Sequence, residues 1–254
     1  MTARISTLAY GAFAYLAFVA SLTYTVFFLA DVVVPKGIDD GPDGPASLAV
    51  VVDLALLALF AVQHSVMARP WFKRAWTRVV PAAAERSTYV LASSAVVGLL
   101  LWQWRPLPAS VWSVEPTWAR ALLWAGYVAG WGLVLFSTFL LGHFDLFGIK
   151  QALARWRSTP YADAEFRTPS LYRFVRHPLM VGFLVAFWCT PDMSVGRLLF
   201  VAMSTAYIVV GVRFEEHDLR RQLGEDYVRY ASEVPRFVPR PRTGLATAPP
   251  PRPH

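Results

Sequence analysis

The sequence is poor in the groups from which many soluble proteins build reactive sites. It contains a single cysteine, Cys189, which excludes an internal disulfide framework and leaves no cysteine pair for a metal. It also has no glycine-rich phosphate loop, no nucleophile elbow and no histidines at a recognised metal-ligand spacing. We therefore expect no metal site.

Charged residues are scarce as well, at 16% of the chain, whereas hydrophobic residues make up 56% and there are 10 tryptophans. A chain of this length and apolar content is not an ordinary soluble domain, so the composition predicts an integral membrane protein whose partner is the lipid bilayer. The formal net charge is +7, but the basic residues lie in loops between apolar runs. No soluble basic domain is present to bind nucleic acid, and we expect none to be bound.

Six apolar segments follow one another along the chain, at approximately 8–30, 48–68, 89–103, 121–141, 179–189 and 196–212. The fifth is short for the roughly 20 residues that a spanning helix needs, so it and the sixth are expected to form one hairpin around Thr190-Pro191-Asp192. The predicted fold is all-α, a polytopic membrane bundle of five or six transmembrane helices.

Loop charges predict the orientation of this bundle, because lysine and arginine prefer the cytoplasmic side. The loop at 31–45 has one lysine against four aspartates, whereas 69–86 has five basic residues against one glutamate. The loop at 105–120 is weakly charged, and 150–176 carries six basic residues. Both termini are then expected to face the cytoplasm, in what we expect to be a bacterial inner membrane.

With this orientation, the polar groups that interrupt the apolar pattern lie at one depth. His64 and His143 fall at the inner ends of the second and fourth segments, His177 at the inner start of the fifth, and Glu215-Glu216 just past the sixth. Ionisable groups near membrane segments mark functional sites more often than structural ones. The shared depth predicts a site that opens to the cytoplasm.

After residue 212 the pattern becomes amphipathic, with Leu219, Leu223, Tyr227 and Tyr230 at helical spacing between charged residues. We expect one amphipathic helix that covers the site, weakened in the middle by glycine and ended by proline. Residues 1–239 then form a single domain, and the Pro-rich tail at 240–254 is expected to be disordered.

The segment from Tyr172 to Pro178 combines two arginines with a predicted helix start. Pro178 suits the first helical turn, which places His177 beside free backbone amides at the positive end of the helix dipole. With Arg173 and Arg176 adjacent, the site suits a carboxylate. The alternative is that the two arginines contact lipid phosphate at the membrane surface.

The paired carboxylates Glu215 and Glu216 lie within a turn of Leu219, so at least one of them should face the bundle. Such a carboxylate can accept hydrogen bonds from ribose hydroxyls or hold a cationic amine. An ion pair with Arg213 or Arg220 is the alternative.

Two further histidines are candidates for moving a proton. His64 and His143 each lie at the end of an apolar segment, and Asp145 is near enough in sequence to orient an imidazole. Of the two, His143 is the preferred candidate for the base, and the alternative is that histidines at such places serve only to cap helices. Gly126 and Gly130 form a small-residue pair that predicts close packing between helices.

Several motifs together carry a resemblance to a known family. Arg176-His177-Pro178, followed by Glu215-Glu216 and the pattern from Leu219 to Pro235, resembles the C-terminal half of the isoprenylcysteine carboxyl methyltransferase superfamily. The wider pattern is similar to bacterial methanethiol S-methyltransferases and related NnrU-type proteins. It comprises Gln63-His64-Ser65, Glu85-Arg86-Ser87-Thr88-Tyr89, Gly142-His143-Phe144-Asp145 and Phe187-Trp188.

This resemblance implies an enzyme that moves the methyl group of S-adenosylmethionine to a small thiol, methanethiol, and releases dimethyl sulfide and S-adenosylhomocysteine. It implies cofactor-binding roles in the helix-start motif, in the glutamate pair and on the covering helix, at Arg176, His177, Pro178, Glu215, Glu216, Tyr227 and Tyr230. One position departs from the superfamily, since Met180 stands where a tyrosine is frequent, and one cofactor contact is then missing.

Other functions remain open from the sequence. A methyltransferase of the same superfamily with a prenylcysteine or lipid acceptor would share these motifs, and sterol-type reductases that use NADPH share the Arg-His-Pro and C-terminal tyrosine pattern. A non-enzymatic NnrU-like accessory protein or small transporter would bind a ligand at the same end without turnover. In that case Glu215 and Glu216 would serve stability rather than rate.

Overall fold

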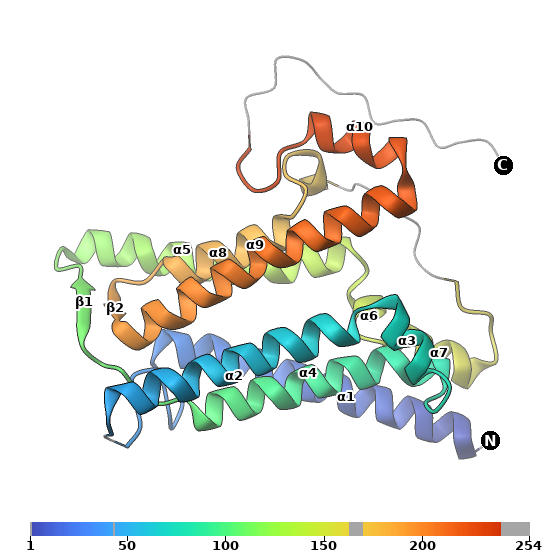
Figure 1. The fold of residues 1–254 in the computed structure, drawn as a ribbon, viewed down its shortest axis with the longest axis horizontal. Coiled ribbons are helices and arrows are strands. Elements are labelled where there is room, and N and C mark those ends of the chain that lie inside the picture. Colours follow the sequence, from blue (N-terminus) through green and yellow to red (C-terminus); the bar gives the residue numbers. More distant parts are fainter. Residues whose placement is uncertain (1, 43, 163–169, 240–254) are drawn as a thin grey trace.

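The structure, a computed structural model, describes residues 2–42, 44–162 and 170–239. The predicted disordered tail at 240–254 lies outside the described residues. The fold is an all-α polytopic membrane bundle, as predicted (Figure 1). Its elements in order are α1 Thr2–Ala30, α2 Ala46–Met67, α3 Pro70–Trp76, α4 Ala82–Gln103, β1 Ser110–Ser113, α5 Thr117–Leu140, α6 His143–Leu146, α7 Ile149–Arg157, η1 Ser170–Arg173, α8 Pro178–Trp188, β2 Asp192–Ser194, α9 Val195–Leu223 and α10 Glu225–Glu233.

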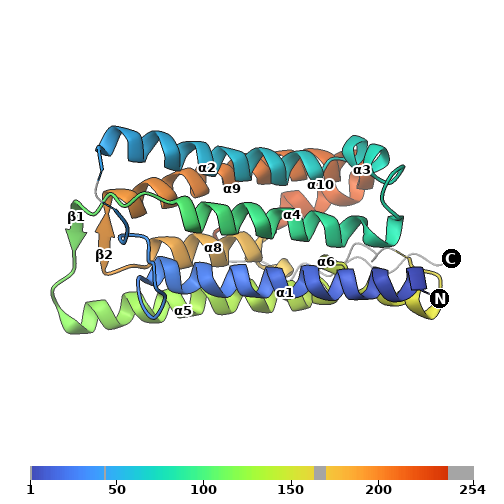
Figure 2. The same ribbon diagram turned by 90° about the horizontal axis from the view of Figure 1, so that it is seen from below.

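The long helices run along a common axis, with β1 and β2 at one end and α3, α6, α7 and α10 at the other (Figures 1 and 2). Helices α1, α2, α5 and α9 are long and apolar enough to cross a membrane, whereas α8 is shorter. Helix α4 has 22 residues and begins with a charged turn that contains Glu85 and Arg86. Large apolar side chains such as Phe13, Val62 and Leu122 are exposed along the helices, as expected for surfaces that contact lipid.

The closest helix approach joins α5 and α8 through two glycines. A Cβ on Gly130 would lie 2.5 Å from the backbone nitrogen of Ala186, and one on Gly182 would lie 2.8 Å from the carbonyl oxygen of Gly130. A Cβ on Gly126 would lie 2.8 Å from the sulfur of Cys189. The prediction that Gly126 and Gly130 pack helices is confirmed. The contact fixes the position of α8, whose first turn carries part of the candidate site.

The fifth and sixth apolar segments do form a hairpin, with its turn between α8 and α9. Ser194 caps α9 by accepting from the backbone amide of Arg197 at 3.1 Å, and Arg197 donates to the hydroxyl of Thr190 at 2.7 Å. The turn also contains β2, which pairs antiparallel with β1. These two short strands were not predicted, because three or four residues are too few to show an alternating pattern.

The predicted single amphipathic helix after residue 212 is wrong in its boundaries. Helix α9 continues without a break to Leu223, and Gly224 then takes a positive φ of 57° and separates it from α10. A positive φ lies outside the range of a right-handed α-helix and is readily adopted by glycine, so Gly224 breaks the pattern here rather than only weakening it. The glutamate pair consequently lies inside α9, and α10 alone folds back over the end of the bundle (Figure 1).

Candidate functional site

Most of the predicted site residues are carried by elements at the end of the bundle opposite the two strands, namely the end of α2, α6, the last turns of α9, and α10 (Figures 1 and 2). His64 is three residues from the end of α2, and His143 is the first residue of α6. His177 is the N-cap of α8, directly before Pro178 at the first helical position, as predicted. The contacts of these residues nevertheless divide them into three separate clusters.

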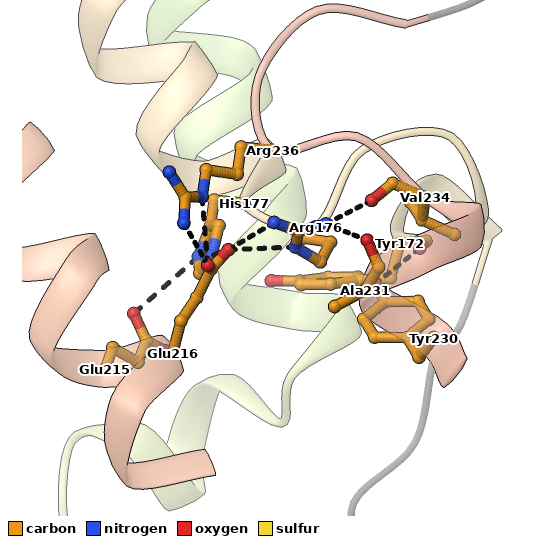
Figure 3. Close-up of polar contacts among 9 residues, drawn as sticks. All are labelled: Tyr172, Arg176, His177, Glu215, Glu216, Tyr230, Ala231, Val234 and Arg236. Atoms are coloured by element: carbon orange, nitrogen blue, oxygen red, sulfur yellow. Dashed lines mark hydrogen bonds and ion pairs between the residues drawn. The ribbon is translucent and has the colours of Figure 1, made fainter. Parts of the chain in front are cut away.

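The first cluster is built around the carboxylate of Glu216, whose side chain is only 2% exposed (Figure 3). Arg176 donates from Nε to Oε1 at 2.8 Å, and Arg236 donates from Nε to Oε2 at 2.9 Å. The second guanidinium nitrogen of Arg176 lies 2.7 Å from Oε1, and that of Arg236 lies 2.7 Å from Oε2. Each arginine therefore contacts its own carboxylate oxygen through two nitrogens. A buried carboxylate that is shared by two guanidinium groups remains ionised.

Arg176 also fastens the covering segment to the start of α8. One terminal nitrogen donates to the carbonyl oxygen of Ala231 at 2.7 Å and also to that of Val234. The backbone amide of Arg176 donates to the carbonyl oxygen of Pro235 at 2.8 Å. The hydrogen bonds therefore join α8, α9 and the chain after α10 into one unit.

His177 lies between the two glutamates. Its Nε2 is 3.3 Å from Oε1 of Glu216, and its Nδ1 is 3.6 Å from Oε2 of Glu215 (Figure 3). Burial lowers the pKa of His177 below its ordinary value of 6.5, and the hydrogen bond to Glu216 offsets part of that effect. The imidazole is therefore mainly neutral at pH 7.

The two glutamates have different environments. The helical spacing predicted that at least one of them faces the bundle, and Glu216 does. Glu216 is buried, whereas the side chain of Glu215 is 52% exposed. Neither forms the predicted alternative ion pair with Arg213 or Arg220, because Glu216 pairs with Arg176 and Arg236 instead.

Three tyrosines pack around this cluster. Tyr230 donates its hydroxyl to the backbone carbonyl of Tyr172 at 2.7 Å, and the rings of Tyr227 and Tyr230 are 5.9 Å apart. Burial raises the pKa of Tyr227 to about 12 and also raises those of Tyr172 and Tyr230, so all three phenols are neutral. Arg173 is exposed at the end of η1.

Sequence reasoning missed Arg236, although it is the second partner of Glu216. It lies after the predicted end of the covering helix, where Pro235 was interpreted only as a stop signal. A basic residue directly after this proline was the available signal. Its role depends on a chain reversal that the local pattern does not reveal.

The second cluster surrounds His143. Its Nε2 lies 2.8 Å from the hydroxyl of Tyr15, and its Nδ1 lies 2.8 Å from the hydroxyl of Thr138. Its ring stacks on Phe139 with centroids 4.4 Å apart. Burial lowers the pKa of His143. Because both ring nitrogens are already engaged, Asp145 does not orient this imidazole, and that expectation is wrong.

Asp145 instead faces away from His143, toward α7. Its carboxylate accepts from the hydroxyl of Tyr161 at 2.5 Å and from the amide of Gln151 at 3.1 Å. The ammonium group of Lys150 is 3.5 Å away. Asp145 also lines a cavity at this end of the bundle.

The third cluster contains His64 and reaches α9. The hydroxyl of Tyr89 lies 2.7 Å from Nε2 of His64, and the ring of Tyr207 on α9 meets the imidazole edge-on at 6.4 Å. The hydroxyl of Ser65 lies 3.2 Å from the hydroxyl of Tyr207. His64 thus contacts the helix that carries the glutamate pair, whereas the contacts of His143 come from α1, α5 and its own loop.

Comparison with known proteins gives the family. The model of the NnrU protein family matches residues 54–217, which include all three clustered histidines and both glutamates. The chain belongs to the NnrU protein family. Tyr227, Tyr230 and Arg236 lie beyond the part that matches the family model.

Relatives of this NnrU chain cover nearly its whole length. A protein of Mycobacterium tuberculosis named methanethiol S-methyltransferase is 50% identical over 94% of this chain and 98% of its own. One of a Pseudomonas species with the same name is 49% identical over 93% and 91%, and methanethiol S-methyltransferase 2 of Bradyrhizobium diazoefficiens is 48% identical over 94% and 92%. These names support a methyltransferase. No solved structure matches the chain.

Proposed function

We propose that this chain is a membrane enzyme that uses S-adenosylmethionine to methylate a small thiol, methanethiol, and releases dimethyl sulfide. The observation that carries the proposal is the similarity, at about half identity over almost the full length, to relatives named methanethiol S-methyltransferase. The loop charges further support a site on the cytoplasmic side of the membrane. The bacterial sources of these relatives support a bacterial inner membrane.

The residues near Glu216 fit the amino-acid end of S-adenosylmethionine, which carries one carboxylate and one ammonium group. Arg236 keeps a terminal nitrogen that does not bond Glu216, and its side chain is 42% exposed, so it suits the carboxylate. The side chain of Glu215 is 52% exposed and suits the ammonium group. Opposite charges on the two groups fix the direction in which the ligand lies.

Arg176 and Glu216 are positioning residues in this proposal. Both are nearly fully buried, and their hydrogen bonds are used within the protein. They hold Arg236 and the chain after α10 against the start of α8. This arrangement limits the access of water to the bound ligand.

The reaction needs alignment and a deprotonated sulfur. When bound, S-adenosylmethionine would supply a methyl group on a positively charged sulfonium. The thiolate sulfur would bond to that methyl carbon in line as the bond from the carbon to the sulfonium sulfur breaks, so the positive charge would disperse and S-adenosylhomocysteine would be the leaving group. A thiol is mostly protonated near pH 7, and a base raises the fraction of thiolate. We assign the base to His64, because its cluster contacts α9, rather than to His143.

The test is an assay of dimethyl sulfide in the headspace above purified protein in detergent, with S-adenosylmethionine and methanethiol added. We expect product from the wild type, a large loss in Glu215→Gln, and no loss in the matched control Glu225→Gln, which is exposed on α10. Binding of S-adenosylmethionine without product would move the search to prenylcysteine or lipid acceptors. Absence of binding would reject the methyltransferase and favour a reductase or an accessory protein.

A further inference from the structure

A second site candidate lies at the same end of the bundle as the three clusters. It is a cavity of about 810 Å³ between α3, the first turn of α4, the end of α5 and helices α6 and α7. Apart from Asp145, none of the residues in the Glu216, His143 and His64 clusters lines it. The proposed methyl transfer gives this cavity no role.

The cavity wall is strongly basic. Four basic side chains, Lys73, Arg74, Arg86 and Arg155, line it against the two carboxylates of Glu85 and Asp145. Lys150, outside the lining set, already pairs with Asp145. Within residues 2–42, 44–162 and 170–239, no ion pair joins any of the four bases to a carboxylate. Among the described residues, no carboxylate neutralises these four bases, so the wall suits an anionic ligand.

Two buried polar atoms on α7 are unsatisfied at this wall. The Nε of Arg155 is a buried donor, and Oε1 of Gln151 is a buried acceptor, and neither has a hydrogen-bond partner among the described residues. Leaving such atoms unpaired is unfavourable, so a ligand that bonds them is stabilised. The complementary ligand carries acceptor oxygens for Arg155 and a hydroxyl for Gln151.

Arg86 is held in place by an aromatic ring. Its guanidinium carbon lies 5.8 Å from the centroid of the Tyr89 ring, a cation–π distance that fixes the group at the start of α4. The other bases come from α3 and α7, so three separate elements converge on the cavity.

Exposed tryptophans flank the bases. Trp71 lies two residues before Lys73 on α3 and is 56% exposed, and Trp156 follows Arg155 on α7 and is 45% exposed. Tryptophan is enriched where a membrane protein meets the polar headgroups. Basic pockets between transmembrane helices at this level bind the headgroups of anionic lipids.

We propose that this cavity binds a phosphate group that carries a neighbouring hydroxyl, as in the headgroup of an anionic phospholipid such as phosphatidylglycerol. Arg155, Arg74, Lys73 and Arg86 bind the phosphate oxygens, and Gln151 accepts from the headgroup hydroxyl. The same chemistry is offered by a soluble glycerol phosphate, and the exposed tryptophans favour the lipid.

The experiment measures binding of two probes to the full-length protein in detergent. Native mass spectrometry detects retained phosphatidylglycerol, and calorimetry detects glycerol phosphate. We expect the wild type to retain phosphatidylglycerol, and Arg155→Gln and Arg74→Gln each to weaken binding about fivefold or more. Arg157→Gln is the matched control, because Arg157 lies on the same helix, is exposed and does not line the cavity.

The outcomes distinguish a lipid ligand from a soluble phosphate, and they include results that overturn the proposal. Binding of glycerol phosphate but not of the lipid, with the same dependence on Arg155 and Arg74, supports the site and assigns it to a soluble phosphate. If the wild type binds neither phosphatidylglycerol nor glycerol phosphate, the proposal is overturned. An equal loss in Arg157→Gln also overturns it, because the effect would then be one of general surface charge. Arg74 is exposed, so its variant is expected to fold even where Arg155→Gln does not.

Discussion

Arg176 and Glu216 form a buried bidentate contact, with Nε of the arginine 2.8 Å and a second nitrogen 2.7 Å from the same carboxylate oxygen. The two side chains are 7% and 2% exposed. Arg236 shares the same carboxylate. Loss of the Glu216 charge would therefore leave the buried guanidinium of Arg176 without a carboxylate partner. This contact connects the stability of the fold to the proposed cofactor site.

The first prediction concerns Glu216. Glu216→Gln removes the charge that two guanidinium groups share, and removing one partner of a buried ion pair costs about 3 kcal/mol or more. We expect a lower free energy of unfolding, measured by thermal or denaturant unfolding in detergent. Glu225→Gln should unfold like the wild type. Equal stability of Glu216→Gln and wild type would contradict the buried ion-pair network.

The second prediction concerns Arg236, whose half-exposed side chain makes a smaller contribution to stability. Arg236→Gln should raise the KM for S-adenosylmethionine about tenfold, the size expected from loss of a charge-assisted hydrogen bond. Calorimetry and initial rates measure the effect. Arg221→Gln, an exposed arginine on α9, is the control. An unchanged KM and affinity would remove Arg236 from the proposed site.

The third prediction separates the two candidate bases by pH. If His64 takes the thiol proton, His64→Gln lowers kcat near pH 7 by about a hundredfold, a typical effect of removing a general base. Activity should recover as the pH rises, because the thiol then ionises without help. His143→Gln should keep the wild-type pH profile. A flat loss of activity at every pH in His64→Gln would instead indicate a structural role.

The fourth prediction tests the glycine contact between α5 and α8. Gly182→Ala places a Cβ 2.8 Å from the carbonyl oxygen of Gly130 and 2.8 Å from the nitrogen of Val134, so the helices must move apart. Overpacking of this kind costs about 1–3 kcal/mol. Gly132→Ala on α5 is the control, since its Cβ has no neighbour within 4 Å. Thermal unfolding of both variants measures the difference, and similar midpoints would refute the close approach.

The fifth prediction concerns the acid side of the stability curve. Burial holds the pKa of His177 in the folded state below its ordinary value of 6.5. The unfolded chain therefore binds the proton more readily, and this residue's contribution to stability is present above pH 6.5 and is lost as the pH falls below it. We expect His177→Gln to show a smaller decline in unfolding midpoint between pH 7.5 and pH 5.5, values chosen to lie on either side of that pKa. An unchanged decline would show that His177 does not titrate in this range.

The bundle and the helix starts were predictable because they depend on local properties. Long apolar segments give membrane helices wherever they occur, and Pro178 starts α8 because its fixed φ and missing amide suit a first turn. The helical spacing also predicted that one of Glu215 and Glu216 would face the bundle, which is confirmed for Glu216. The break at Gly224 between α9 and α10 was missed, because a glycine in a helical pattern is compatible with both a weakened and a broken helix.

The sequence by itself determined that the chain forms an all-α membrane bundle with its ionisable residues on neighbouring helix ends. Only the tertiary structure decided which of those residues meet. The reversal after Gly224 brings Arg236 back to Glu216, whereas the left-handed Gly142, with φ of 90°, begins a separate turn in which His143 and Asp145 face different partners. Pairings of this kind depend on how helices are packed and where the chain reverses, and neither is encoded in the spacing of residues along a single segment.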